Sequence, residues 1–335
     1  IHVTINSRLL PITSHQSPSK NLRQSEVMGT MHSQVKIENI FEAVNLWCSD
    51  KPAAIKQFGP IECWDTSDIT NMSRLFLARA DFNSDISKWN VSNVTNMMFM
   101  FQDATSFNQD ISRWDVSNVS TMSYMFHGAA NFNQNIGRWD VSSVRDMKCM
   151  FCHASSFNQD IGNWNTSRVT NMYNMFHGAQ SFNQNVGRWV VSNVTSMHCM
   201  FSYAESFNQN ISQWDVSKVK TMQSMFFHAV AFNQNISCWD VSRVTTMHCM
   251  LYGATSFSQN ISGWDVSNVT SIDDMLDPIL FSKFKKLKVT SFFQGKYLQM
   301  PRLERKQVFE FCFLWDRRRA YVIFLVANGY LHSDH

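Results

Sequence analysis

Charged side chains recur at fixed intervals along the sequence, and charge is the first chemistry that they offer. Basic residues share one column, whose members are 25 residues or a multiple of 25 apart: Lys88, Arg113, Arg138 and Arg188. Acidic residues share a second column, two positions later: Asp65, Asp115, Asp140, Asp215, Asp240 and Asp265. One interpretation is a ladder of exposed ion pairs, each contributing little to stability. The other is a charged face for a protein or glycan partner, formed by Lys88, Arg113, Asp115, Arg138, Asp140, Arg188, Asp215 and Asp240.

Aromatic and imidazole side chains form a second candidate surface. They lie on the side of each repeat that the sequence predicts to be helical: Tyr124, His127, Tyr173, His177, His198, Phe227, His248 and Tyr252. Rings gathered on one face are typical of contact surfaces. The alternative is that these are scattered surface residues with no common role.

Metal-ligating residues also recur, but their spacing does not favour a metal site. Cys149 and Cys152 form a CxxC pair without a second pair at zinc-ribbon spacing. His127, Cys152 and His177 share a column in three successive repeats, yet packed helices would hold them roughly 8–10 Å apart. Cys149, Cys199 and Cys249 are each two repeats apart, beyond the ~7 Å limit for a disulfide. We therefore expect neither a metal nor any other cofactor.

Enzyme signatures are missing from the sequence. It contains no GxSxG, HExxH, P-loop or glycine-rich dinucleotide turn. Stacked Asp residues would suit a polysaccharide lyase or hydrolase, but here each Asp belongs to the repeat and no repeat holds its own cluster of carboxylates. The sequence therefore predicts a protein that is not an enzyme.

A period of 25 residues positions all of these side chains. Nine tryptophans are spaced by 25 residues without an insertion or deletion: Trp64, Trp89, Trp114, Trp139, Trp164, Trp189, Trp214, Trp239 and Trp264. Phe, Met and Ser columns keep the same step, for example Phe82 to Phe257 and Ser67 to Ser267. A fixed period of this length indicates a solenoid of stacked coils.

Each coil is predicted to contain one short strand and one short helix. In the coil that begins at Phe107, Ile111, Trp114 and Val116 flank polar residues at strand-like spacing. From Val119 to Ala129, apolar residues at offsets of 0, 3, 6, 7 and 10 trace one face of a helix. The sequence thus predicts an α/β repeat solenoid of about nine coils with parallel strands. The apolar columns form its core, and a sugar-stacking stripe is the alternative for the tryptophans.

An asparagine column accompanies the core columns. It runs through Asn83, Asn108 and Asn133 to Asn233 and ends with Ser258. We expect these amides to form a side-chain ladder that pairs backbone groups in the connecting loop. Calcium binding is the alternative, but one coil offers too few carboxylates for it.

The flanking segments differ from the array. Residues 1–34 are polar and aperiodic, and are predicted to be disordered. Residues 35–60 form a helical N-terminal cap: one amphipathic helix contains Ile37, Ile40, Phe41, Val44 and Trp47, and a second opens at Asp50 and Pro52 and stops at Gly59. The array spans 61–277, and 278–335 is a basic and apolar tail of uncertain structure.

Charge and hydropathy set limits on the partners. The 335 residues carry a net charge of +3, but from Phe281 onward 11 Lys/Arg stand against 4 Asp/Glu. This composition suggests a membrane-proximal tail, although its longest apolar run, 320–327, is far shorter than the ~20 residues that span a bilayer. The basic residues of the tail have no repeating aromatic spacing, so we expect no nucleic-acid partner.

The recurring motif FNQDISxWDVSNVTxMxxMF, present for example from Phe107 to Phe126, resembles the BspA-like leucine-rich-repeat family. The resemblance covers about Ile61 to Leu276. It implies a leucine-rich-repeat-like solenoid at the cell surface or outside the cell, used for adhesion or protein binding, and it supplies no catalytic residues. The expected function is a non-enzymatic scaffold for protein or glycan ligands. The alternatives are a matrix protein that binds an ordered polymer or ice, and an intracellular scaffold.

Overall fold

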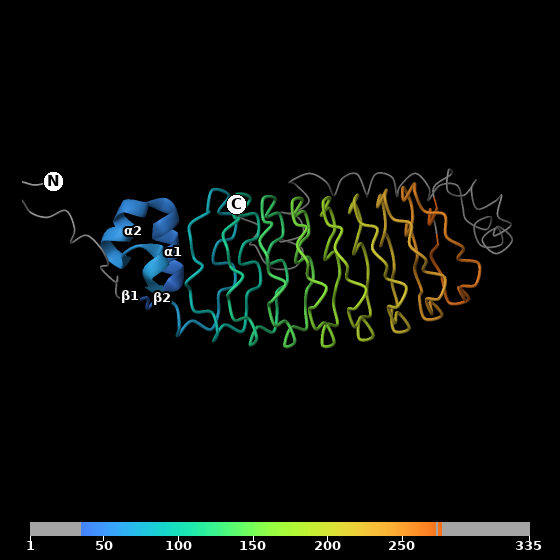
Figure 1. Cartoon of the computed structure of the whole chain (residues 1–335), viewed down its shortest axis with the longest axis horizontal. Helices are drawn as coiled ribbons and strands as arrows, with labels where there is room; N and C mark the ends of the chain where they lie inside the picture. The colour runs from blue at the N-terminus through green and yellow to red at the C-terminus, as the bar shows by residue number, and fades with distance from the viewer. Residues whose placement is uncertain (1–34, 273, 277–335) are drawn as a thin grey trace, which may run out of the picture. The chain divides into compact units, whose positions relative to one another are not determined.

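The computed structural model describes residues 35–272 and 274–276. The predictions for 1–34 and 278–335 lie outside the described residues. Successive coils follow one another in a single row from the helical cap onward (Figure 1). The described part of the chain is therefore a repeat solenoid, built by stacking one 25-residue unit on the next.

Two short helices precede the coils, in the two segments where the sequence predicts them. Helix α1 spans Ile40–Ser49, and helix α2 spans Lys51–Phe58. The Asn39 side chain accepts hydrogen bonds from the second and third amides of α1, those of Phe41 and Glu42, and Asp50 caps α2 in the same way through Ala53. The first helix is shorter than predicted: Ile37 is buried as expected, but it precedes the helix instead of lying in it. Phe41 lies in the helix, but its side chain is 40% exposed instead of facing the core.

Polar and aromatic contacts attach the cap to the coils. Strand β1 (Val35–Lys36) pairs in parallel with β2 (Trp64–Asp65), which follows a short 3-10 turn at Ile61–Cys63. The Trp47 and Trp64 rings pack edge to face with their centroids 5.7 Å apart, and the indole N–H of Trp47 donates to Ser84 Oγ. Arg79, at a position where the other coils carry Ala, donates to Asn45 Oδ1 of α1 at 2.7 Å. The first coil is thereby covered by the cap.

The solenoid is confirmed, but the predicted helix of each coil is wrong, and the predicted strand is wrong for every described coil after the first, in which β2 lies. From Thr66 to Leu276, no described residue lies in a helix or an extended strand. The Ile-x-x-Trp-x-Val half consists of turns. The backbone pairing between coils instead lies in the half predicted to be helical, where single residues form parallel bridges from coil to coil, as in Asn71–Asn96–Thr121–Asp146–Asn171 and Ser196–Thr221–Thr246–Ser271.

The apolar spacing that imitates a helix comes from consecutive turns. Tyr124 N–H donates to Lys148 of the next coil, and Phe126 N–H donates to Met150. The amides of the alternate residues, such as Met125 and His127, instead close turns by donating to the carbonyls three residues earlier in the same coil. Each coil has a pair of left-handed residues four positions apart, for example Cys149 (φ 53°) and His153 (φ 57°). Because every second amide leaves its own coil, a continuous α-helix cannot form.

Asn, Asp, Ser and Thr side chains favour these turns. At up to three positions in a coil, a side-chain oxygen accepts the backbone N–H two residues later. In one coil, Asp110 pairs with Ser112, Asp115 with Ser117, and Thr121 with Ser123. Such local bonds compete with helices and strands for the backbone. The polar columns therefore hold the coil in its turns.

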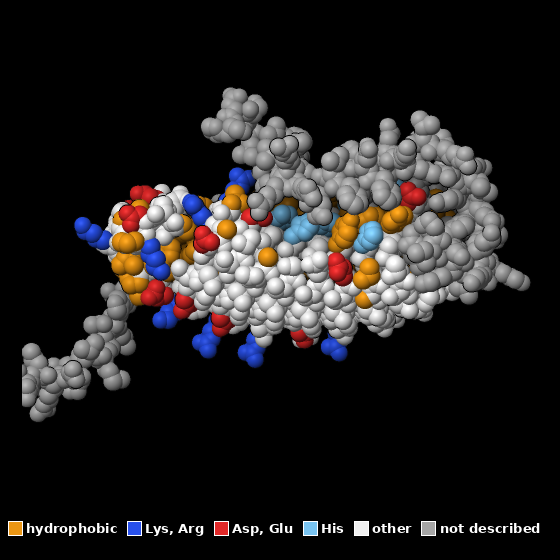
Figure 2. All heavy atoms as spheres, turned by 90° about the horizontal axis from the view of Figure 1, so that it is seen from above, with side chains coloured by type: hydrophobic (Ala, Val, Ile, Leu, Met, Phe, Trp, Pro, Cys, Tyr) orange, Lys and Arg blue, Asp and Glu red, His pale blue; other side chains and the backbone are white. Residues whose placement is uncertain are grey.

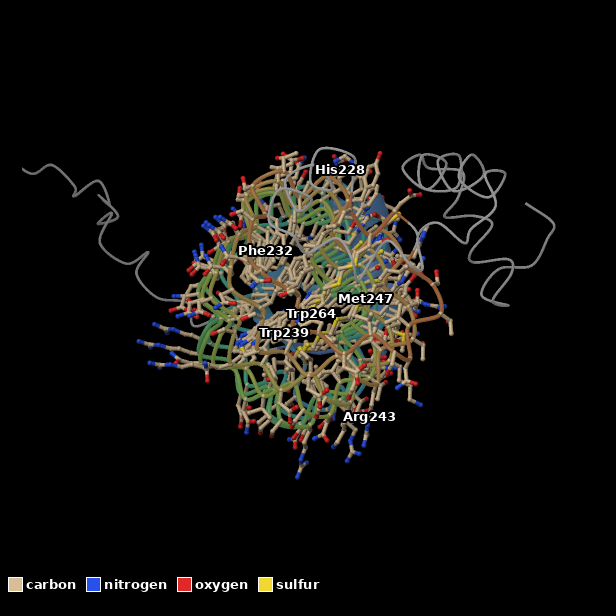
Figure 3. The ribbon with its side chains drawn as sticks, turned by 90° about the vertical axis from the view of Figure 1, so that its right-hand side faces the viewer. His228, Phe232, Trp239, Arg243, Met247 and Trp264 are labelled. Atoms are coloured by element: carbon tan, nitrogen blue, oxygen red, sulfur yellow. The ribbon has the colours of Figure 1, made fainter. Side chains whose placement is uncertain are left out.

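The apolar columns form one continuous core, as predicted. The rings of Phe126 and Phe151, one coil apart, stack with their centroids 5.7 Å apart. The nine repeat tryptophans are 1–4% exposed, which excludes a sugar-stacking stripe. From Trp89 onward, each indole N–H donates to a backbone carbonyl of an earlier coil, 28 residues before it, as Trp164 does to Ile136 at 3.1 Å. Figure 3 shows Trp239, Trp264, Phe232 and Met247 inside the stack, with Arg243 at its rim.

The asparagine ladder is confirmed. The backbone N–H of each Asn or Ser in the column donates to the side-chain oxygen of the Asn one coil earlier at 2.9 Å, from Asn108 on Asn83 to Ser258 on Asn233. The Gln that follows adds a second donor, as Gln184 does to Asn158.

One buried column of valines contains a polar residue. Thr166 is buried there, and its hydroxyl donates to the carbonyl of Val190.

Removing one rung of the asparagine ladder should destabilise the array. Asn158→Ala leaves the Asn183 amide without its acceptor and removes one of the two acceptors of the Gln184 side chain, which keeps the Asn158 backbone carbonyl, so we expect a loss of about 1–3 kcal/mol in the free energy of unfolding. Asn235→Ala is the matched control, because it removes only an exposed turn bond to Ser237. Urea denaturation of the two variants measures the difference. Equal losses would contradict the ladder's role.

Candidate interaction surfaces

All eight residues of the predicted charged face are exposed, on the turns that flank each buried tryptophan. They are Lys88, Arg113, Asp115, Arg138, Asp140, Arg188, Asp215 and Asp240. The buried Trp and Val at alternating positions fix the backbone, so the residues between them point outward. The basic and acidic columns therefore occupy constant places from coil to coil.

The acidic column closes turns. Ser217 donates both its hydroxyl (2.6 Å) and its backbone N–H (3.1 Å) to Asp215 Oδ1, and these bonds lower the pKa of Asp215. Ser142 and Ser242 lower the pKa of Asp140 and Asp240 in the same way. At pH 7 these carboxylates are ionised, and one oxygen of each is already engaged within its own turn.

The predicted ladder of ion pairs does not form. In the described part of the chain, no salt bridge joins the basic column to the acidic column, and only two pairs of any kind are close enough, Lys36–Asp68 and His127–Asp103. The Ser–Asp bonds explain the difference, because they hold the carboxylates against their own turns. Basic neighbours act on these acids only at longer range, as Lys218 does on Asp215.

Three of the eight predicted residues, His127, His177 and Tyr252, lie in one row with His153, Tyr203 and His228. Tyr124 and Phe227 contact this row, whereas Tyr173 stacks on His198 in a separate pair. Rings from successive coils lie 4.9–6.0 Å apart along His127, His153, His177, Tyr203, His228 and Tyr252. Figure 2 shows histidine side chains gathered among hydrophobic ones on this face. The spacing is shorter than the 8–10 Å expected on the helical side, because no helices separate the coils. That distance argument against a shared metal was therefore wrong.

Glycines make room for this row, and sequence reasoning missed them. Gly178 adopts φ 68°, and a Cβ on it would lie 2.5 Å from the His153 ring of the preceding coil. Gly253 is placed in the same way under His228, and Gly128 under Asp103. A glycine thus follows each of Asp103, His153 and His228 one coil later, whereas Tyr203 is followed by His228 and the two rings stack. The signal was present in the sequence as His-Gly-Ala at both 127–129 and 177–179.

Burial keeps the centre of this row uncharged. Desolvation lowers the pKa of His177 to about 3, helped by the neighbouring His153 and His127, and burial lowers the pKa of His198 to about 4. Both imidazoles are neutral at physiological pH. Within the described ranges, no group of three or more His, Cys, Asp or Glu is arranged to hold a metal ion. No disulfide joins Cys149, Cys152, Cys199 and Cys249 to one another, and burial raises the pKa of Cys152.

Comparison with known families decides what kind of chain this is. A family described as "Mycoplasma protein of unknown function, DUF285" matches three overlapping stretches, 48–151, 114–208 and 184–288. The chain belongs to this family. The three tandem matches to the DUF285 family are consistent with BspA-like repeats. A comparison with curated proteins gives no match. None of the helices in the described residues is long and apolar enough to cross a membrane.

Acidification should destabilise the array through His177. The unfolded chain takes up a proton near pH 6.5, whereas the folded chain does so only near pH 3, so unfolding becomes more favourable below about pH 6.5. Between pH 7 and pH 5 this one residue should cost about 2 kcal/mol. His177→Phe should remove that share of the loss, since Phe227 occupies the same column two coils later. Chemical denaturation at the two pH values tests this, and an unchanged pH dependence in the variant would contradict it.

Proposed function

We propose that this DUF285-family chain is a non-enzymatic scaffold that binds protein or glycan ligands along its coils and acts in adhesion or recognition at the cell surface. One observation carries the proposal. The buried columns repeat almost unchanged, whereas the exposed position before each tryptophan varies through Lys88, Arg113, Arg138, Asn163, Arg188, Gln213, Cys238 and Gly263. A rigid frame with variable outward positions suits recognition over several coils.

The exposed hydroxyls count against the alternative of an ordered polymer or ice surface. Ser120 Oγ donates to the Thr95 carbonyl at 3.0 Å, and Thr245 Oγ1 donates to the Lys220 carbonyl at 3.1 Å. Arg145 and Lys220 also interrupt that column of small hydroxyl residues. These hydroxyls act within the array, so they do not form a free regular lattice.

Binding spread over several coils predicts that single substitutions have small effects. The full chain is screened against immobilised neutral, acidic and sulfated glycans and against purified extracellular-matrix proteins. For any ligand found, we expect Arg138→Gln to weaken binding by less than about tenfold, because one exposed charge contributes little. Loss of all binding in that variant would contradict distributed recognition. Turnover of a polymer in the screen would contradict a non-enzymatic role.

Surface display has its own test. Intact cells that produce the protein are treated with a protease, and the coils are followed with an antibody. We expect the signal to disappear without lysis. A signal that survives on intact cells and disappears only after lysis would favour the intracellular scaffold.

A further inference from the structure

The basic column has the form of a continuous ridge. Lys88, Arg113, Arg138 and Arg188 are exposed at the same position of their coils, with the exposed Asn163 completing five successive coils; we call these residues the basic ridge. Figure 2 shows lysine and arginine side chains spaced along one edge of the coils. The tryptophans that follow Asn163 and Arg188 stack in parallel with their ring centroids 6.3 Å apart, so neighbouring ridge positions recur at a similar distance.

The four cations of the ridge are available for a ligand. Among the described residues, none of them makes an ion pair or a side-chain hydrogen bond. Basic residues elsewhere behave differently: Lys218 donates to Asn193 Oδ1, and Arg79 donates to Asn45. The residue before each cation is small, Ser87 and Ser112 in two coils and Gly137 and Gly187 in the others. The tryptophan that follows is buried, so neither neighbour hides the cation.

Charge compensation weakens along the ridge. The residue three positions before Lys88 is Asp85, and before Arg113 it is Asp110. Each cation lowers the pKa of that acid, after the stronger effect of a serine. Before Arg138 and Arg188 the same position holds Asn135 and Asn185, which carry no charge. Those two arginines therefore keep the larger uncompensated positive charge.

We infer that the basic ridge binds a linear anionic polysaccharide, with uronate carboxylates or sulfate groups of successive sugars facing successive coils. This inference rests on the proposed scaffold function and names its ligand class. The coil spacing is comparable to the length of one sugar residue in an extended chain. The planar guanidinium of arginine pairs with carboxylate or sulfate through two parallel hydrogen bonds.

Single-stranded nucleic acid fits this ridge less well. Proteins that hold single strands combine cations with exposed aromatic rings on which the bases stack. The aromatic residues beside the ridge are the tryptophans, and Trp114, Trp139 and Trp189 are only 3–4% exposed. The residues before the cations are half-buried Ser and Gly, and the exposed residues two positions after them are Asn90, Asp115, Asp140 and Val190. None of these offers an aromatic face for a base, and the amide and carboxylate groups can pair with sugar hydroxyls.

The test measures binding of the full chain to four immobilised probes: polygalacturonate, dextran sulfate, neutral dextran and single-stranded polyuridylate. The ridge variant is K88Q/R113Q/R138Q/R188Q. The matched control, R168Q/K218Q/K220Q/R243Q, removes the same number of exposed charges from other columns. Both variants keep residues 278–335, so the basic tail is the same in each. Thermal unfolding checks that both variants remain folded.

We expect the wild type and the control to bind polygalacturonate or dextran sulfate, and the ridge variant to lose at least about tenfold in affinity. Neutral dextran should not bind. Equal loss in the two variants would overturn the assignment in favour of unspecific attraction, and binding of polyuridylate alone would overturn it in favour of nucleic acid. Binding to none of the four probes would also overturn the ridge, whereas a ligand from the broader screen would leave the scaffold function standing.

Discussion

The hydrogen bonds between neighbouring coils are the constraint on which the structure depends. About half of the amides in the turn segment of one coil donate to the next coil, as Phe151 does to Met175, and the Asn column adds a second ladder. Both ladders need equivalent residues to face one another. A single insertion would move Trp, Phe, Met and Asn out of register together, which explains why the period stays at 25 residues throughout.

The sequence predicts what repeats in three dimensions, and it is weaker on what happens within one repeat. The buried tryptophans, the stacked phenylalanines, the asparagine ladder and the capped helices α1 and α2 all follow from residue type and spacing. The helix within each coil was wrong, because apolar residues three and four apart also suit consecutive turns with left-handed residues such as Tyr124 and Gly128. Spacing alone does not separate the two structures; the frequent Asn, Asp and Ser residues favoured turns.

The candidate surfaces show the same division. Exposure of the charged columns could be predicted, since buried residues alternate with them. The bonding partner of each acid could not be predicted, because both Ser217 and Lys218 are close enough in sequence to pair with the Asp215 carboxylate. In the structure, the hydroxyl and the backbone amide of Ser217 donate to it. The close row of histidines was likewise hidden, since it depends on coils that lie together without helices between them. The proposed scaffold function rests on this division: the inside of each coil is fixed by packing, and the outward positions vary from coil to coil.

A pair of internal deletions tests the stacking account most directly. Removing residues 134–183 takes out 50 residues, joins Asn133 to Gln184 and preserves both ladders and the alternation of Gly128 with Tyr203. Removing 137–183 takes out three fewer residues at the same place and breaks the register. We expect the first protein to unfold cooperatively in urea with protected inter-coil amides in hydrogen exchange, and the second to lose protection beyond the junction. Similar protection in both proteins would contradict the claim that inter-coil register holds the fold together.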